Sequence, residues 1–262
     1  MNLSWDQLQN LCRIAQDAGA EVMQVYSVGG STWVKEDQSP LTEADLRSDA
    51  VIRERLEAAF PSMFILSEES SSPAGQSADP FFLVDPLDGT REFLKRNGEF
   101  TVNIALVSQG EAVAGVVYAP ALGEMFYAAR GLGAWKSLGG DARRLNTSAV
   151  DGTRALRIIG SRSHGVEDLE RWTARLSCAH ELVAAGSSLK FCRIAEGHAD
   201  VYPRIGPTCQ WDTAAGHAVL QQAGGVVLDP QGRPLAYGTG RPMLNSHFIA
   251  IGDRSLELPS IA

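Results

Sequence analysis

The sequence Phe81-Phe-Leu-Val-Asp-Pro-Leu-Asp-Gly-Thr90 decides the architecture of the chain, because it joins a buried strand to a helix through an acidic corner. The apolar run 81–84 predicts a short buried strand, and Pro86 is expected to end it. The Asp-Gly dipeptide is typical of a turn, and residues 90–94 predict the first turn of a helix. Such a corner suits a hard divalent cation and a phosphate group, although an acidic turn without function has the same composition.

The composition is that of a globular protein and excludes several classes of function. The chain has 262 residues, 44% hydrophobic and 21% charged, which allows one large domain or two smaller ones. Its net charge of −8 argues against a general nucleic-acid surface, but not against an anionic small substrate, because bound metals reverse the local sign. The four cysteines are far apart without a CxxC pair, so we expect reduced thiols in a cytoplasmic protein. There is no signal-peptide pattern, and no apolar run approaches the ~20 residues of a membrane span.

Residues 1–150 predict an N-terminal α+β domain. Ser4 and Gln7 form a capping box ahead of an amphipathic helix over 5–26, and Thr42 caps a second helix. The polar stretch 29–40 predicts an irregular loop, either a plain connector or a lid. Many strands with few helices between them favour a largely antiparallel sheet, with a hairpin formed by the third and fourth strands. The predicted strands are 63–66, 81–84, 100–107, 112–119, 124–129 and 134–136.

Residues 151–262 predict a C-terminal α/β domain. A polar texture over residues 145–154 marks the boundary, and beyond it strands and helices alternate, as in a layer with crossover connections. The predicted strands are 156–159, 181–184, 200–202, 226–228 and 248–251, and the predicted helices are 167–176, 188–196 and 212–223.

Four acidic residues, Glu68, Asp85, Asp88 and Asp212, fall at predicted strand ends or helix starts. Each has a plain structural explanation when taken alone. An acidic residue at a strand end is often merely solvated, and Asp212 is interpreted as a helix N-cap. Asp45 likewise suits the dipole at the start of its helix. Only the combination of these residues points to a site.

Three separated segments together resemble the signatures of the inositol monophosphatase superfamily. They are Glu68-Glu-Ser70, Asp85-Pro-Leu-Asp-Gly-Thr90 and Trp211-Asp-Thr-Ala-Ala-Gly216, and their order and separation fit over nearly the whole chain. The resemblance implies a layered αβαβα sugar-phosphatase-like fold and a magnesium-dependent, lithium-sensitive phosphomonoesterase.

Four further segments resemble the 3′(2′),5′-bisphosphate nucleotidases of the CysQ type within that superfamily. They are Ser39-Pro-Leu-Thr-Glu-Ala-Asp45, Ser161-Arg-Ser-His164, Gly186-Ser-Ser-Leu-Lys190 and Ala199-Asp-Val-Tyr-Pro-Arg204. This resemblance implies hydrolysis of adenosine 3′(2′),5′-bisphosphate to AMP and phosphate, in sulfate assimilation and sulfur metabolism. The alternatives are a phosphatase acting on myo-inositol 1-phosphate, a catalytically silent metal-binding homologue, and an acidic structural protein.

By resemblance, two or three Mg²⁺ ions would be held by Glu68, Asp85, Asp88, Asp212 and the main-chain carbonyl of Leu87. Oxygen ligands suit Mg²⁺, and the absence of His and Cys at these positions argues against zinc.

The resemblance also assigns the catalytic residues. Thr90 would orient the attacking water, with Asp45 as its partner in a dyad that accepts the proton. Glu68 is included with this dyad as a catalytic residue and metal ligand. Its neighbour Glu69 is the alternative ligand and is otherwise expected to lie outside the direct contacts of the metal. The backbone N–H groups of Gly89 and Thr90 would bind the phosphate that is cleaved.

Substrate recognition rests on basic and polar residues in the C-terminal part. Lys190 and Arg204 are candidates to hold the phosphate that stays on the product, and His164 and Ser187 to contact the nucleotide. Asp212 is also expected to contact the substrate. Ordinary alternatives are a surface charge for Arg204 and a helix cap for His164.

The expected partner is a small nucleotide bisphosphate and not a nucleic-acid polymer. Members of the CysQ type act on the cytoplasmic side and can associate peripherally with the inner membrane. The sequence leaves oligomeric state and the number of bound ions open.

Overall fold

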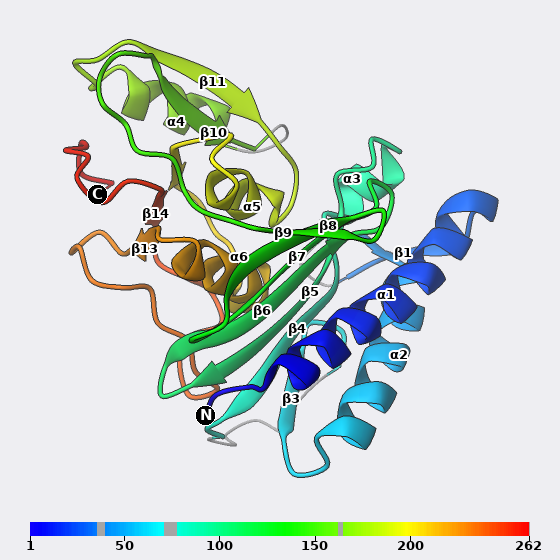
Figure 1. Ribbon diagram of the computed structural model, residues 1–262. Coiled ribbons are helices and arrows are strands. Elements are labelled where there is room, and N and C mark those ends of the chain that lie inside the picture. The colour runs from blue at the N-terminus through cyan, green and yellow to red at the C-terminus, as the bar shows by residue number, and fades with distance from the viewer. Residues whose placement is uncertain (36–39, 71–77, 162–164, 262) are drawn as a thin grey trace.

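The computed structural model describes residues 1–35, 40–70, 78–161 and 165–261, which form alternating layers of helices and sheets (Figure 1). A helix pair, a seven-stranded sheet, a second helix pair, a five-stranded sheet and a last helix follow one another. This is the αβαβα fold that the resemblance implied. Each sheet has helices on both faces, so its central strands are buried on both sides, whereas the edge strands β9 (Asp141–Arg144) and β11 (His180–Ala184) are mostly exposed.

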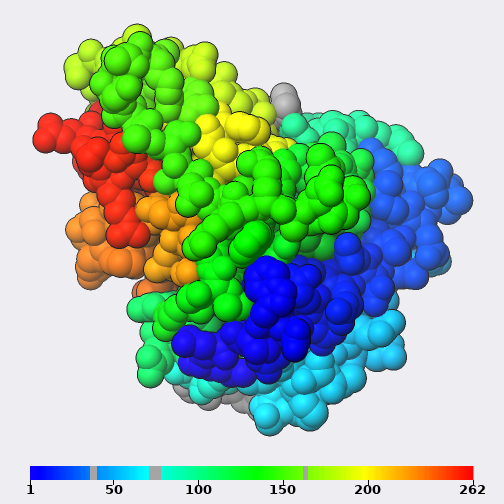
Figure 2. Space-filling model, in the orientation of Figure 1, coloured from blue at the N-terminus to red at the C-terminus, as the bar shows by residue number. Residues whose placement is uncertain are grey.

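The first layer is made of α1 (Trp5–Val28) and α2 (Glu43–Ala59). The predicted capping box at Ser4 and the predicted cap at Thr42 are both present, and Asp45 completes a capping box with Thr42 that was not predicted. The apolar faces of the two helices bury Leu8, Leu11, Ile52 and other side chains against one face of the seven-stranded sheet. In the space-filling view, the blue to cyan N-terminal residues lie on one side of the central green residues, and the orange to red C-terminal residues lie on the other (Figure 2).

The seven-stranded sheet has the order β3-β4-β5-β6-β7-β8-β9. Only the first pair is parallel, so the prediction of a largely antiparallel sheet is confirmed, as is the β5–β6 hairpin. The last strand was not predicted, because its residues are all exposed and polar or small. The strands are β3 (Phe64–Ser67), β4 (Phe81–Asp88), β5 (Thr101–Ser108), β6 (Glu111–Ala119), β7 (Glu124–Ala129), β8 (Gly133–Leu138) and β9 (Asp141–Arg144).

The β4 strand continues through Pro86, so the prediction that this proline ends the strand is wrong. The pairing of β4 with β5 changes register between Asp85 and Asp88. Proline has no N–H to donate, but a register shift leaves the strand with a position where no ladder bond is needed. The irregularity therefore lies directly at the acidic corner.

The second helix pair, α5 (Leu189–Ala195) and α6 (Gln210–Gln222), lies between the two sheets. The five-stranded sheet has the order β11-β10-β12-β14-β13 and carries α4 (Val166–Thr173) on its outer face, where Trp172 is buried. The alternation of strands and helices predicted for this part is confirmed. Its strands are β10 (Leu156–Gly160), β11 (His180–Ala184), β12 (Val201–Arg204), β13 (Val226–Leu228) and β14 (Phe248–Ile251).

The stretch predicted as an irregular loop over 29–40 contains one short strand and the first residue of a second. β1 (Thr32–Val34) pairs antiparallel with β2 (Pro40–Thr42), which leads directly into α2. The prediction was incomplete because strands of three residues are too short to show an alternating pattern, and β1 is also fully exposed. Residues 36–39 lie outside the described residues.

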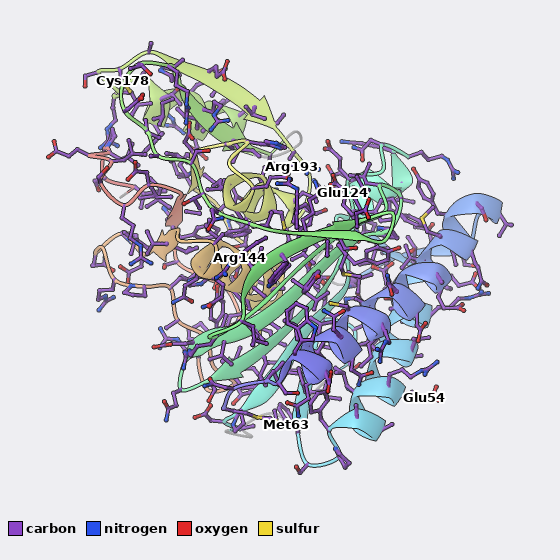
Figure 3. All side chains as sticks on the ribbon, in the orientation of Figure 1. Glu54, Met63, Glu124, Arg144, Cys178 and Arg193 are labelled. Atoms are coloured by element: carbon purple, nitrogen blue, oxygen red, sulfur yellow. The ribbon has the colours of Figure 1, made fainter. Side chains whose placement is uncertain are left out.

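A buried ionic cluster joins β7, β8 and α5. The Glu196 carboxylate is fully buried and accepts from Lys136 at 2.8 Å and Arg193 at 2.5 Å. Arg193 also donates to Glu124 at 2.7 Å, and these two side chains lie close together in Figure 3. One hydrophobic core likewise contains Leu145 from the first part of the chain and Ile159 from the second. The division into 1–150 and 151–262 stays a prediction.

Candidate active site

The acidic corner places its residues by tight local geometry. Asp85 is buried near the end of β4, where its Oδ1 accepts from the Leu87 N–H at 3.1 Å. Gly89 follows with φ +90°, and a Cβ there would lie 2.2 Å from the Ser187 hydroxyl. Only glycine fits both this backbone and this contact. The next residue, Thr90, begins the short helix α3 (Thr90–Leu94).

Three carboxylates converge on this corner. Glu68 after β3, Asp85 on β4 and Asp212 on α6 each offer an oxygen, and these oxygens lie within 4.8 Å of one another. Helix α6 begins at Gln210 with Cys209 as N-cap, so the prediction of Asp212 as N-cap is wrong. Asp212 occupies the third helical position instead, where its Oδ2 accepts from the Cys209 N–H at 2.8 Å.

The Asp88 carboxylate lies beside this cluster with one oxygen held by the protein. Its Oδ2 accepts from the Ser188 N–H at 2.7 Å and from the Asn103 amide at 3.2 Å, and the Ser188 hydroxyl lies 2.9 Å away. Asp85 and Asp212 are likewise held through one oxygen each. Asp85 Oδ1 accepts from the Leu87 N–H, and Asp212 Oδ2 accepts from the Cys209 N–H. Among the residues that the structure describes, the second oxygen of each carboxylate accepts no hydrogen bond and is available to another partner.

Burial and mutual repulsion raise the pKa values of these carboxyls. Burial, together with the charge of Asp88, raises the pKa of Asp212 to about 8. Burial and the charges of Glu68 and Asp88 raise the pKa of Asp85 well above its ordinary value. Burial also raises the pKa of Asp88, although the charge of Lys190 and the hydrogen bonds that Ser188 and Asn103 donate to Asp88 oppose the shift. The cluster therefore holds more negative charge than the protein compensates, which favours binding of a cation.

Thr90 and Asp45 are brought together as the resemblance implied. The Thr90 hydroxyl lies 3.4 Å from Asp45 Oδ1 and 3.4 Å from the Leu87 carbonyl oxygen. The other oxygen of Asp45 accepts from the N–H of Thr42 at 2.7 Å and from its hydroxyl at 2.6 Å. Burial raises the pKa of Asp45 to about 6.

Lys35 occupies a position that the sequence reasoning missed. Its ammonium group donates to Glu68 and to Glu69, each at 2.6 Å. Burial alone would lower the pKa of Lys35, but the Glu68 carboxylate beside it raises that pKa. Burial raises the pKa of Glu69 to about 7. Lys35 follows β1, and a lone lysine in a polar stretch gave no signal of this contact.

A cleft with a volume of about 340 Å³ opens over the carboxylates, within the size range of small-molecule sites. It brings together nearly all the site residues predicted from both halves of the chain. Aromatic side chains and small polar residues complete its wall. The lining includes Glu68, Asp85, Leu87, Asp88, Gly89, Thr90, Ser187, Lys190, Phe191, Tyr202, Arg204 and Asp212.

The two basic candidates lie on the wall of this cleft. Lys190 is buried, donates to the Ser187 carbonyl at 2.7 Å, and lies 5.4 Å from the centre of the Tyr202 ring. Burial lowers the pKa of Lys190 to about 8. Arg204 donates to the Pro207 carbonyl at 2.7 Å, which uses one of the five N–H donors of its guanidinium group.

Ser187 contacts the acidic corner, and its hydroxyl lies 2.8 Å from the carbonyl oxygens of both Asp88 and Glu99. His164 lies outside the described residues. Sequence reasoning missed Ser188 and Asn103, since neither belongs to an acidic or basic motif. The only signal for Ser188 was its position in the segment 186–190, whereas Asn103, within a predicted strand, gave no signal.

The donor set of the cluster fits a hard divalent cation. The three converging groups are carboxylates, and the nearby Asp88 and Leu87 carbonyl would add oxygen donors. Neither His nor Cys contributes to this cluster within the described part of the chain.

Comparison with known proteins places these features in one family. The model of the inositol monophosphatase family matches residues 4–255. The 3′(2′),5′-bisphosphate nucleotidase CysQ of Salmonella typhimurium is 46% identical over 92% of this chain and 98% of its own length. The protein of the same name from Escherichia coli K12 is 45% identical, again over 92% of this chain and 98% of its own.

Solved structures give the same result. CysQ from Bacteroides thetaiotaomicron, described as a bacterial member of the inositol monophosphatase family, superimposes with a TM-score of 0.83 at 36% identity, covering 95% of this chain and 98% of the other. The extragenic suppressor protein suhB from Bartonella henselae gives a TM-score of 0.78 at 29% identity, covering 95% and 94%. Among the described residues, no helix is long and apolar enough to cross a membrane.

Proposed function

Since the chain belongs to the inositol monophosphatase family, we propose that it is a metal-dependent phosphatase that hydrolyses adenosine 3′(2′),5′-bisphosphate to AMP and phosphate. The observation that carries this proposal is the convergence of Glu68, Asp85 and Asp212 beneath a cleft that Lys190 and Arg204 also line. Negative groups for a cation and positive groups for a second phosphate then lie within one site. The expected role is in sulfate assimilation, which is consistent with the names of the CysQ relatives.

We propose Mg²⁺ as the cation, in two or three copies, held by Glu68, Asp85, Asp88, Asp212 and the Leu87 carbonyl. When bound, the ions supply neutralisation of phosphate charge and a lowered pKa for water. The all-oxygen donor set supports this choice over zinc.

The residues of this chain would orient the reaction. Thr90 positions the attacking water, and Asp45 accepts a proton through the threonine hydroxyl, since the two side chains face each other. Glu68 is proposed as a further catalytic residue besides Thr90 and Asp45, because its carboxylate belongs to the acidic cluster. Lys35 donates to this carboxylate. The N–H groups of Gly89 and Thr90 would bind the phosphate that is cleaved.

Lys190 and Arg204 would hold the phosphate that remains on the product, and Ser187, Asp212 and His164 would contact the nucleotide. A dianionic group suits two cationic side chains on one wall. The expected location is the cytoplasm, including the cytoplasmic face of the inner membrane.

A substrate panel tests the proposed function. We expect Mg²⁺-dependent phosphate release from adenosine 3′,5′-bisphosphate, from its 2′,5′ isomer and from 3′-phosphoadenosine 5′-phosphosulfate, inhibited by Li⁺. A preference for myo-inositol 1-phosphate would overturn the substrate assignment. No phosphate release from any of these compounds with Mg²⁺ would overturn the assignment as a phosphatase.

A further inference from the structure

Ser188 links two proposed metal ligands that come from different parts of the chain. It precedes α5, is 1% exposed, and does not belong to the lining of the cleft. Its backbone N–H donates to Asp88 Oδ2 at 2.7 Å. Its hydroxyl oxygen lies 2.9 Å from the same carboxylate oxygen and 2.6 Å from the main-chain carbonyl of Asp212.

The number of protons on Ser188 and Asn103 determines which of these contacts are hydrogen bonds. The Ser188 hydroxyl carries one proton and has lone pairs to accept another bond. The Asn103 amide donates to that hydroxyl at 2.9 Å and to Asp88 Oδ2 at 3.2 Å. Since Asp88 Oδ2 already accepts from the Ser188 N–H and from Asn103, the hydroxyl proton is best used by the closer Asp212 carbonyl.

The orientation of Asn103 supports this arrangement. Its side-chain carbonyl oxygen is buried without a hydrogen-bond partner among the described residues, an unfavourable state for a buried acceptor. Rotating the amide would place that oxygen against the Asp88 carboxylate, where the two would repel. Asn103 thus leaves one acceptor unpaired, and its amide donates to Asp88 and Ser188.

The consequence is a fixed relation between β4 and α6. Asp88 is held through its carboxylate, whereas Asp212 is held through its main chain, which leaves the Asp212 side chain directed by Cys209. A partner behind a metal ligand typically changes metal affinity by about 10- to 100-fold when it is removed.

We propose that Ser188 is a positioning residue that sets the spacing of Asp88 and Asp212 and thereby the affinity of the site for a divalent cation. This inference rests on the proposed function, because both carboxylates are proposed ligands. Ser188 itself contacts neither cation nor substrate, since it lies behind the cleft wall.

The test measures cation binding directly, by titration calorimetry with Mg²⁺ and by the electron paramagnetic resonance of added Mn²⁺, on the full chain. Ser188→Ala removes the hydroxyl but keeps the N–H, so we expect affinity for one ion to fall by about tenfold. The Mg²⁺ concentration for half-maximal activity should rise to the same extent. At saturating Mg²⁺, kcat and the KM for substrate should stay within about threefold of wild type, a split that a general loss of folding would not produce.

Two further variants control the result. Ser188→Thr retains the hydroxyl and should restore affinity to within about threefold of wild type. Ser108→Ala removes another buried serine hydroxyl, which accepts from the N-terminal amine at 3.0 Å, and should leave cation affinity unchanged. If Ser188→Ala does not fold, Asn103→Ala replaces it, because it removes the donor to both Ser188 and Asp88, and it carries the same expectation.

The outcomes separate the two proposals. Wild-type affinity in Ser188→Ala, or in Asn103→Ala where that variant replaces it, overturns the positioning role while the proposed function stands. A wild-type protein that binds neither Mg²⁺ nor Mn²⁺ overturns the proposed function, and the inference with it.

Discussion

The Thr90 hydroxyl lies 3.4 Å from Asp45 Oδ1, although the two residues lie in the first turns of different helices and are 45 positions apart. Asp45 cannot turn away readily, because the N–H and the hydroxyl of Thr42 hold its other oxygen. The contact thus places the hydroxyl of Thr90, a residue that lines the cleft, beside the Asp45 carboxylate, which Thr42 holds in place.

Replacing Thr90 tests this dyad. We expect Thr90→Ala to lower kcat by about 10²- to 10⁴-fold, the usual contribution of a positioned proton-transfer group, because the water loses its orienting hydroxyl. Mg²⁺ binding, measured by calorimetry, should persist. Thr90→Ser keeps the hydroxyl and serves as the matched control. Equal kcat in Thr90→Ala and wild type would remove Thr90 from the reaction.

The metal-free protein should lose stability as pH rises through neutrality. Burial raises the pKa of Asp212 to about 8 and of Glu69 to about 7, whereas carboxyls in unfolded chains titrate near ~4. Between about pH 6.5 and 7.5 the native state therefore binds protons that the unfolded state lacks, so the free energy of unfolding falls as pH rises. His217 and Lys190 oppose this fall, because burial lowers the pKa of His217 to about 4 and of Lys190 to about 8, so the unfolded state binds more protons at these two groups. The stability still falls, since the native state binds more protons at Asp212 and Glu69 than the unfolded state gains at His217 and Lys190.

Thermal unfolding in a chelator checks this pH dependence. The Tm should decrease from about pH 6.5 to 7.5 without Mg²⁺ and should change much less with excess Mg²⁺, because bound cations keep the carboxylates ionised. A Tm that rises over this range in the chelator would contradict the raised pKa values.

Asp88→Asn tests the metal site without removing a side chain. Its amide can still present a carbonyl oxygen to the Ser188 N–H, which now donates to Asp88 at 2.7 Å, so the fold should be preserved. The lost charge should abolish phosphate release and weaken Mg²⁺ binding. Circular dichroism checks that the fold is preserved, calorimetry measures Mg²⁺ binding, and a phosphate assay measures turnover. Retained turnover would show that the metal site lies elsewhere.

The corner 85–90 shows which parts of the fold could be predicted from the sequence and which could not. Alternating and apolar runs predicted most strands, and the capping box at Ser4 and the cap at Thr42 predicted the starts of α1 and α2. Pro86 misled the prediction because a register shift in the sheet, which depends on the facing strand, lets the proline stay within β4. A local pattern cannot contain that information.

The candidate site was predictable where its residues belong to charged motifs. Glu68, Asp85 and Asp212 do come together, which only the resemblance could suggest, since they are separated by long stretches. Lys35 and Ser188 were not found, because a lysine in a polar loop and a serine before a helix are ordinary residues. Their contacts arise from tertiary packing alone.

Lys190 and Arg204 are tested by comparing two substrates. If they hold the phosphate that stays on the product, Lys190→Met and Arg204→Ala should each lower kcat/KM for adenosine 3′,5′-bisphosphate by about 10- to 100-fold, as for a lost charged hydrogen bond of ~1.5–3 kcal/mol. The loss for adenosine 3′-monophosphate should be much smaller, because this substrate has no second phosphate. Arg233→Ala, at an exposed arginine paired with Asp229, is the control. Equal losses on both substrates would contradict the assignment.

The buried Glu196 should stabilise the contact between the seven-stranded sheet and α5. Its carboxylate is fully buried and pairs with Lys136 and Arg193, of which Lys136 is itself nearly buried. Glu196→Ala would leave these cations with fewer partners in a low-dielectric site, so we expect the free energy of unfolding to fall by about 3–5 kcal/mol. Glu111→Ala removes an exposed partner of Arg130 and should cost less than about 1 kcal/mol. Denaturant unfolding measures both variants, and equal losses would show that the buried cluster contributes no more than a surface ion pair.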